Sequence, residues 1–302
     1  MSLTPPDGTA LACLGGTPAF DKPLHVGRPN IGDQAAFLAR TQTILDERYF
    51  TNNGPMVREF ECRIAAYVGV KHCVAMCNAT IALEIAMRAL GFTGEVFSFH
   101  ATKFLNSFEG GAVVTDDDEL AAKMRLMRNF GFADYDKVIY TGTNGKMTEI
   151  CAAMGLTSLE AIDDLIAVNR RNYESYRTEL AAIPGLALID YAPGHRCNFQ
   201  YIVLEVDPAA SPLTRDDLVA VLHAENILAR KYFWPGAHKM EPYRSYFPNA
   251  GMLLPVTERL ASRIMVLPTG QSISAATIGA ICGLIKRALL LAPQVKAALS
   301  PK

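Results

Sequence analysis

Apolar residues recur along the first half of the chain in two patterns, one typical of helices and one typical of short buried strands. The helical spacing predicts helices over 34–45, 55–68, 79–90 and 116–129. Short apolar runs predict strands over 71–76, 95–99 and 112–115. Strands that alternate with helices are typical of a layered α/β domain. We therefore predict an α/β domain with a mainly parallel sheet over residues 34–182.

The second half of the chain has a different pattern. Residues 157–160 read as a capping box, which predicts a long helix from Thr157 to about Ala182, before Pro184 and Gly185. The pattern then predicts strands over 186–189, 201–206 and after 227, a helix over 214–225, and two closing helices. This order indicates a smaller α+β domain over 183–302, and five prolines within residues 1–33 indicate an extended N-terminal arm.

Composition and charge exclude several classes of protein. The 302 residues include 29 basic and 30 acidic side chains, and this net charge of -1 gives no general positive field for a nucleic acid. Seven cysteines without a C-x-x-C pair predict free thiols in a reducing compartment. The N-terminus lacks a basic and then apolar leader, and Lys286 and Arg287 interrupt the apolar stretch 278–291. We expect a cytoplasmic protein that is not bound to a membrane.

Common nucleotide and metal motifs do not fit the chain. There is no G-x-G-x-x-G, and residues 142–147 resemble a P-loop only superficially, because Met147 stands where a Ser or Thr is required. The six histidines show no metal-ligand spacing, so we expect no metal site.

Two turns carry residues suited to binding and catalysis. Asn78, Ala79 and Thr80 join a strand to a helix, where free backbone amides bind phosphate, although an ordinary helix cap reads the same way. Ser98 and Lys103 follow another strand, at the kind of edge where α/β sheets bind ligands. A shielded lysine there can form a Schiff base with a carbonyl, whereas most lysines are solvated surface charges.

Three stretches of the sequence together point to one protein family. They are CNATIALEIAMRALG, FSFHATKFLNSFEGGAVVT and GTNGKMTEICAAMGL, in chain order. From about Leu24 onward the chain resembles the DegT/DnrJ/EryC1/StrS family of nucleotide-sugar aminotransferases. These enzymes depend on pyridoxal 5'-phosphate (PLP) and have the fold of aspartate aminotransferase, fold type I. The likeness is greatest to the branch that acts on dTDP-4-dehydro-6-deoxyglucose.

The resemblance implies a role for each candidate. Lys103 would form the Schiff base with PLP and later act as acid and base. Ala79, Thr80 and Ser98 would bind the PLP phosphate, and Asn144 would reach it from the neighbouring subunit of a homodimer, although Asn144 also reads as a turn residue. The reaction would move an amino group from glutamate, through pyridoxamine 5'-phosphate, to C4 of a dTDP-4-keto-6-deoxyhexose. A sugar dehydratase of the same family would have His in place of Lys103.

The chain departs from the family before the Lys103 strand. Members continue after Gly91 into further strand–helix units, which carry an aromatic residue that stacks on the PLP ring and an Asp that pairs with its nitrogen. Here Gly94 leads directly into that strand, and no Asp matches; residues 116–118 read as solvated acids in the first turn of a helix. Either the natural protein has a segment absent from this sequence, or the chain is a weakly active or non-catalytic dimeric member.

A loop in the smaller domain combines basic and aromatic residues. Lys231, Tyr232, Trp234 and His238 lie within a stretch of eight residues. Cations suit the diphosphate of a nucleotide sugar and aromatic rings suit a base or sugar, so these four residues are candidates for substrate binding. A loop packed between domains would have the same composition.

Overall fold

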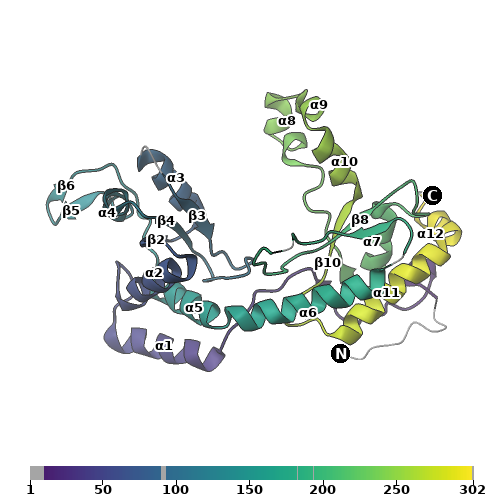
Figure 1. Cartoon of the computed structure of the whole chain (residues 1–302), viewed down its shortest axis with the longest axis horizontal. Coiled ribbons are helices and arrows are strands. Elements are labelled where there is room, and N and C mark those ends of the chain that lie inside the picture. The colour runs from purple at the N-terminus through teal and green to yellow at the C-terminus, as the bar shows by residue number, and fades with distance from the viewer. Residues whose placement is uncertain (1–9, 90–92, 182, 193, 301–302) are drawn as a thin grey trace. The chain divides into compact units, whose positions relative to one another are not determined.

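The structure, a computed structural model, describes residues 10–89, 93–181, 183–192 and 194–300. The chain divides into two compact units (Figure 1). We call residues 29–164 the N-terminal unit, and residues 1–28 with 165–302 the C-terminal unit. This division differs from the predicted domains, because the boundary falls at residue 164 and not at 182, and most of the predicted arm belongs to the C-terminal unit.

The N-terminal unit contains the helices and strands predicted before residue 130 in the predicted order, followed by three elements that the pattern did not predict. It contains α1 (Gln34–Glu47), α2 (Pro55–Val68), β2 (His72–Met76), α3 (Ala79–Ala89), β3 (Glu95–Ser98), β4 (Gly111–Thr115), α4 (Asp118–Met127), β5 (Phe132–Asp134), β6 (Lys137–Val138) and α5 (Glu149–Glu160). Helix α6 (Ile162–Leu180) then leads into the C-terminal unit. Leu90 and Ala182, where two predicted helices end, lie outside the described residues.

The predicted helix start at Thr157 is wrong. Helix α5 begins earlier, where the hydroxyl of Thr148 accepts a hydrogen bond from the Cys151 amide at 3.4 Å. Thr157 is buried within α5, and its hydroxyl donates to the Ala153 carbonyl one turn back at 2.9 Å. A side chain that bonds the preceding turn in this way does not cap a helix.

Strands β2, β4 and β3 form a three-stranded sheet in that order (Figure 1). Both pairs are antiparallel, so β2 and β3 run in the same direction and β4 runs against them. The sheet therefore differs from the mainly parallel one that we expected. Residues 99–110, between β3 and β4, form a loop without a helix, and a chain that returns without a crossover helix pairs antiparallel.

Helices cover both faces of this sheet. Val74, Met76 and Val113 pack on one face in a core shared with α3 and α4. On the other face, α2 packs against β2, and Phe60 of α2 contacts Phe99 edge to face at 5.3 Å. The sheet is thus fixed in place at the end where Ser98 and the start of α3 lie.

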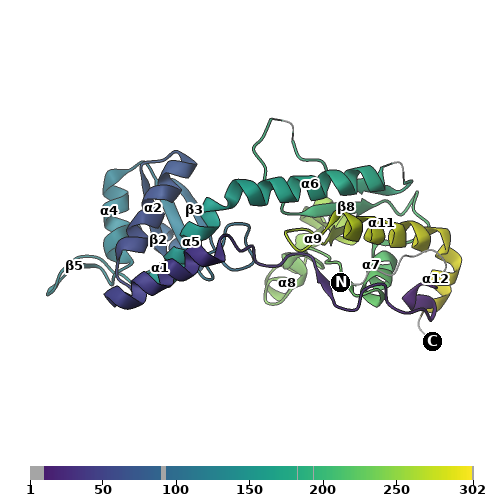
Figure 2. The ribbon, with the colours of Figure 1, turned by 90° about the horizontal axis from the view of Figure 1, so that it is seen from below.

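The C-terminal unit is built around an antiparallel sheet of order β10-β8-β7. Its elements are η1 (Ala12–Leu14), β1 (Leu24–His25), β7 (Leu186–Leu188), β8 (Ile202–Val206), α7 (Arg215–Ala224), β9 (Ile227–Leu228), η2 (Ala237–Lys239), α8 (Tyr243–Tyr246), α9 (Ala250–Leu253), α10 (Pro255–Arg263), β10 (Ile264–Leu267), α11 (Ala275–Leu290) and α12 (Ala292–Leu299). Figure 2 shows α11 beside α6, where Lys286 and Glu179 form an ion pair at 2.9 Å.

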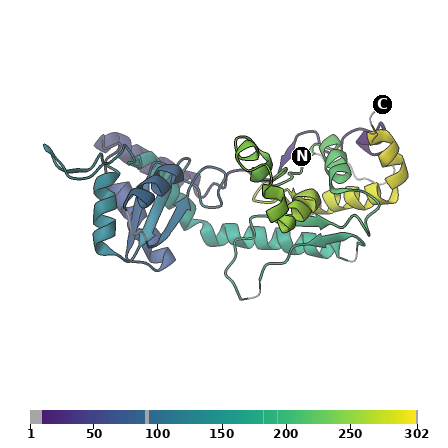
Figure 3. The ribbon, with the colours of Figure 1, turned by 90° about the horizontal axis from the view of Figure 1, so that it is seen from above.

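The described residues of the N-terminal arm up to Arg28 lie on this unit. Its backbone amides at Ala12 and Ala19 donate to the two carboxylate oxygens of Glu225, each at 2.7 Å. Strand β1 of the arm pairs in parallel with β9. Figure 1 shows the short helices α8 to α10 standing away from the sheet of the same unit, and Figure 3 shows this unit from above.

Among the described residues, no single helix is long and apolar enough to cross a membrane; α11 and α12 reach that length only as a pair bent by 87°.

Candidate functional site

One row of residues crosses the end of the N-terminal sheet. Lys146 forms an isolated β-bridge with Met76. Met76 pairs with Gly111 of β4, and Gly111 pairs with Ser98 of β3. Register partners in a sheet point to the same face, so Ser98 shares the face on which α3 lies. A Cβ atom on Gly111 would lie 2.5 Å from the Ala79 amide nitrogen, so only glycine allows α3 to begin this close to the sheet.

The first turn of α3 has uncommitted hydrogen-bond donors. The side chain of Asn78 caps the helix by accepting from the Ile81 amide at 2.8 Å. Within the described residues, the amides of Ala79 and Thr80 and the hydroxyl of Ser98 have no hydrogen-bond partner. Free amides at a helix N-terminus together with a neighbouring hydroxyl form an anion site of the kind that binds phosphate.

Lys103 lies in the loop that leads from Ser98 into β4. The loop is closed by hydrogen bonds from the Phe99 amide to the Gly110 carbonyl and from the Ser107 amide to the Phe99 carbonyl, each at 2.8 Å. Asn106, almost fully buried, accepts on its carbonyl a hydrogen bond from the Ser158 hydroxyl at 2.8 Å. These contacts fix the buried side of the loop. Lys103 itself is exposed.

Asn144 lies on the opposite side of the sheet row from Ser98. Its carbonyl accepts a contact from the Cys77 thiol at 3.8 Å, and its side chain accepts a hydrogen bond from the Lys146 ammonium at 2.6 Å. Burial lowers the pKa of Lys146. Lys146, two residues after Asn144, is separated from Ser98 by β2 and β4, about 14 Å at the usual strand spacing.

The three acids at residues 116–118 lie at the other end of β4 and are engaged locally. Asp116 accepts a hydrogen bond from the Lys71 amide, Asp117 caps α4, and Asp118 pairs with His72 at 2.7 Å. The interpretation of these residues as acids of a helix start is confirmed. None of them is placed to act with Lys103.

In the C-terminal unit, Lys231 and Trp234 belong to a packed cation–aromatic cluster. The Trp234 ring lies 5.3 Å from the buried guanidinium of Arg215 and 5.9 Å from the Lys231 ammonium. Asp216 pairs with both cations, at 2.8 and 3.0 Å. Sequence reasoning missed Arg215 and Asp216, because an Arg-Asp pair in the first turn of a helix is common.

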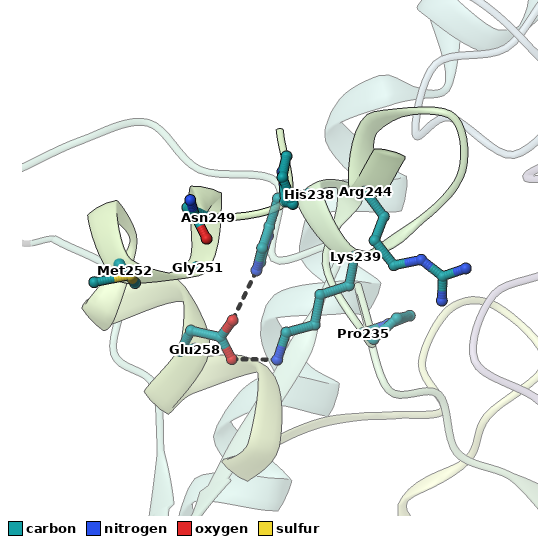
Figure 4. Close-up of a pocket in the computed structure, with 9 residues that line it drawn as sticks. Pro235, His238, Lys239, Arg244, Asn249, Gly251, Met252 and Glu258 are labelled. Atoms are coloured by element: carbon teal, nitrogen blue, oxygen red, sulfur yellow. Dashed lines mark hydrogen bonds and ion pairs between the residues drawn. The ribbon is translucent and has the colours of Figure 1, made fainter. Parts of the chain in front are cut away.

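Tyr232 and His238 have different surroundings. Tyr232 contacts the ring of Tyr201 edge to face. His238 pairs with Glu258 at 2.9 Å, and Lys239 pairs with the second oxygen of the same carboxylate (Figure 4). These side chains line a cavity of about 740 Å³, formed by Pro235, His238, Lys239, Arg244, Pro248, Asn249, Gly251, Met252 and Glu258. Of the four predicted substrate residues, His238 alone lines this cavity.

The chain matches the model of the DegT/DnrJ/EryC1/StrS aminotransferase family over residues 32–96 and 92–286. The chain belongs to this family. It is 26% identical to dTDP-4-amino-4,6-dideoxy-D-glucose transaminase of Shigella dysenteriae, over 84% of the chain and 96% of that protein. It is also similar to the crystal structure of DesI in the presence of its TDP-sugar product, with a TM-score of 0.87, 35% identity, and coverage of 95% and 98% of the two chains.

A third similarity shows the fold alone. The crystal structure of S. venezuelae DesV in complex with a ketimine intermediate matches with a TM-score of 0.76 at 20% identity, over 89% and 96% of the two chains. The predicted family and fold type are therefore confirmed: the chain is a PLP-dependent aminotransferase of fold type I. The residues present fit the phosphate end of PLP, because the uncommitted donors at Ala79, Thr80 and Ser98 lie in one place, ahead of the Lys103 loop.

The relatives are longer than this chain in the region before the Lys103 strand. The alignment with the Shigella dysenteriae protein is 357 residues long, so that protein has stretches without a counterpart among the 302 residues of this chain. The two stretches that match the family model overlap at residues 92–96, a range that includes the first two residues of β3. This is the position at which the sequence departs from the family.

Proposed function

We propose that the chain transfers an amino group from glutamate to C4 of a dTDP-4-keto-6-deoxyhexose. The observation that carries the proposal is the cluster of free donors at the start of α3, next to Ser98 and ahead of the Lys103 loop. The substrate class is supported by two relatives, a dTDP-4-amino-4,6-dideoxy-D-glucose transaminase and DesI with its TDP-sugar product. The cytoplasmic location that we propose is supported by seven cysteines that are all free thiols.

Each residue has a defined task in this reaction. When bound, PLP supplies the aldehyde and the electron-withdrawing ring that amino transfer requires. The amides of Ala79 and Thr80 and the hydroxyl of Ser98 bind the phosphate. Lys103 takes the proton from the amino-bearing carbon of glutamate and later delivers a proton to C4 of the sugar. Lys231, Tyr232, Trp234 and His238 remain candidates for the nucleotide sugar.

Turnover of the purified protein tests this function. The protein is incubated with PLP, glutamate and dTDP-4-keto-6-deoxyglucose, and the amino sugar is detected by mass spectrometry. We expect Lys103→Ala to abolish the product and Lys137→Ala, a change at another exposed lysine, to leave it unchanged. Borohydride added with PLP should attach the coenzyme covalently to Lys103. Product formation by Lys103→Ala at the normal rate would refute the assignment.

A second candidate function is favoured by the length of the relatives. A chain without the residues that stack on the PLP ring and pair with its nitrogen would bind the coenzyme and turn over poorly. In that case borohydride labels Lys103 and no amino sugar appears. The two measurements together therefore distinguish an aminotransferase from a weakly active member.

We further propose a homodimer in which Asn144 of one subunit binds the phosphate in the other. The position of Asn144 close to Lys146, at the end of the sheet row away from Ser98, supports this arrangement. Mixed dimers of Asn144→Ala and Lys103→Ala should regain activity at limiting PLP, because one of their two sites has neither change. If Asn144 acts within its own chain, both sites of a mixed dimer carry one change and its activity does not exceed that of the Asn144→Ala protein.

A further inference from the structure

Two neighbouring side chains share the carboxylate of Glu258. One of its oxygens, Oε1, accepts a hydrogen bond from His238 Nε2 at 2.9 Å, and the other accepts one from the Lys239 ammonium (Figure 4). His238 and Lys239 are consecutive residues of η2, whereas Glu258 lies on α10. The bonds from Lys239 and His238 lower the pKa of Glu258, so its carboxylate is charged at neutral pH. One acid thus fixes both side chains next to each other.

Two glycines leave the room that this arrangement needs. A Cβ atom on Gly236 would lie 2.7 Å from Cε1 of His238. A Cβ atom on Gly251 would lie 2.8 Å from Oε1 of Glu258, the oxygen that bonds His238. The His238 side chain is only 9% exposed. A larger residue at either position would therefore displace the ring or the carboxylate.

The cavity of about 740 Å³ beside these side chains has a positive lining. Among the residues that line it, Lys239 and Arg244 are cationic and Glu258 is acidic. Arg244 also pairs with Glu241, which is not part of the lining. The lining itself carries a positive charge even with a neutral His238, and a positive lining favours an anionic ligand.

The same cavity offers free hydrogen-bond donors and an apolar wall. Lys239 has three ammonium hydrogens and uses one of them for Glu258. The side-chain amide of Asn249 has no partner within the described residues. Pro235 and Met252 supply apolar surface, and the volume lies in the range of small-molecule sites. A phosphate ester with a less polar remainder suits this combination.

We propose that Glu258 is a positioning residue of the substrate site, which holds His238 and Lys239 so that Lys239 binds a phosphate of the nucleotide sugar in this cavity. The inference rests on the proposed function, which makes His238 a candidate for that substrate. Without the carboxylate, the Lys239 side chain is free to change rotamer, and binding must then order it. The negative charge of Glu258 opposes a phosphate, so its contribution is the placement of Lys239.

Gly251→Ala moves the carboxylate without removing a charge. Alanine is favoured within a helix, and the added Cβ comes close only to the end of the flexible Glu258 side chain, so α9 should stay intact. We expect the dissociation constant of dTDP, measured by calorimetry with the PLP-loaded protein, to rise about tenfold. The KM for the nucleotide sugar should rise similarly, with kcat unchanged. Gly279→Ala, whose Cβ meets no atom within 4 Å, is the matched control.

Two further variants separate position from charge. Glu258→Gln cannot accept a hydrogen bond from Lys239 on its amide nitrogen, so dTDP should again bind more weakly. With Lys239→Ala already in place, Gly251→Ala should have little further effect on dTDP, because the two changes act through one contact. Tighter dTDP binding by Glu258→Gln would overturn the proposal, since charge and not placement would then govern the anion.

Other results would also contradict the positioning role. If Gly251→Ala lowers the unfolding midpoint and leaves the dTDP affinity unchanged, Glu258 has only a structural role. Pyrophosphate should compete with dTDP for the parent chain, and a failure to compete would mean that the phosphates are not recognised. The absence of measurable dTDP binding by the parent chain would equally overturn the proposal.

The binding measurements need no turnover, so they fail or succeed independently of the proposed function. If dTDP binding weakens in Gly251→Ala and the parent chain forms no amino sugar, the positioning role stands and the aminotransferase assignment fails. If the parent chain forms amino sugar and Gly251→Ala binds dTDP normally, the positioning role fails and the assignment stands.

Discussion

Glu61 and Arg128 form a buried ion pair that holds both backbone groups of Ala75. The Glu61 carboxylate accepts from the Ala75 amide at 2.8 Å, and the Arg128 guanidinium donates to the Ala75 carbonyl at 2.6 Å. Glu61 is 7% exposed and Arg128 is 4% exposed. The two side chains take the place of a neighbouring strand along this part of β2. Since Ala75 is three residues before Asn78, they also fix the turn at which α3 begins.

Removing one member of this pair should destabilise the protein strongly. Arg128→Met leaves the Glu61 carboxylate buried without its partner, and we expect the free energy of unfolding to fall by about 3–5 kcal/mol in urea denaturation. The double variant Glu61→Gln with Arg128→Met should lose less than the two single changes added together. A loss below about 1 kcal/mol for Arg128→Met would mean that the pair is solvated.

Gly111→Ala should disturb the coenzyme site through the backbone. The added Cβ would lie 2.5 Å from the Ala79 nitrogen, so α3 or β4 must shift. We expect weaker PLP binding, measured by absorbance titration, together with a lower unfolding midpoint. Gly279→Ala is the control, because its Cβ meets no atom within 4 Å and alanine is favoured within a helix. Unchanged PLP binding in Gly111→Ala would mean that the N-terminus of α3 does not bind the phosphate.

Ser98→Ala should weaken PLP binding and leave the fold intact. The Ser98 hydroxyl has no partner within the described residues, so removing it breaks no contact of the unliganded chain. A hydrogen bond to a charged group contributes about 1.5–3 kcal/mol, so the dissociation constant of PLP should rise about tenfold or more. Ser175→Ala, on α6, should leave it unchanged. An equal PLP affinity in Ser98→Ala and the parent chain would exclude a contact with the phosphate.

Local patterns predicted most helices and strands of the N-terminal unit, because residues that begin or end an element flank many of them. Asp33 caps α1, and Pro55 begins α2. Thr157 was misread because its spacing to Glu160 fits a cap equally well when both residues lie inside a helix. The direction of the sheet depends on connections between distant segments, which spacing along the chain does not encode.

The candidate site was predictable only in part. The strand-to-helix turn and the loop lysine were visible as motifs, and their proximity follows from the pairing of Ser98 with Gly111. The contacts on the buried side of the Lys103 loop could not be predicted from local sequence. The hydrogen bond between Ser158 and Asn106, for example, joins residues 52 positions apart. The cation–aromatic cluster was visible at Lys231 and Trp234, but its buried Arg215 comes from another element.

Glu149 should give the protein a distinctive dependence on pH. One oxygen of its carboxylate accepts from the Met56 amide at 2.7 Å, and the other is buried without a partner in the described structure. Burial raises the pKa of Glu149. For a raised acid pKa, the stabilising contribution is complete below the unfolded value, about 4.3, and is lost as pH rises through the folded value. Glu149→Gln should therefore gain stability relative to the parent chain between about pH 5 and about pH 7.5.

Glu160→Gln is the matched control with the opposite sign. Burial alone would raise the pKa of Glu160, but hydrogen bonds from Arg40 and Arg63 outweigh it and lower that pKa. The contribution of a lowered acid pKa is present above the unfolded value and is lost as pH falls through the folded one. We therefore expect urea unfolding at about pH 5 and about pH 7.5 to show opposite trends. The free energy of unfolding of Glu149→Gln should rise relative to the parent chain at the higher pH, and that of Glu160→Gln should not. A pH-independent difference for Glu149→Gln would mean that its carboxylate is solvated.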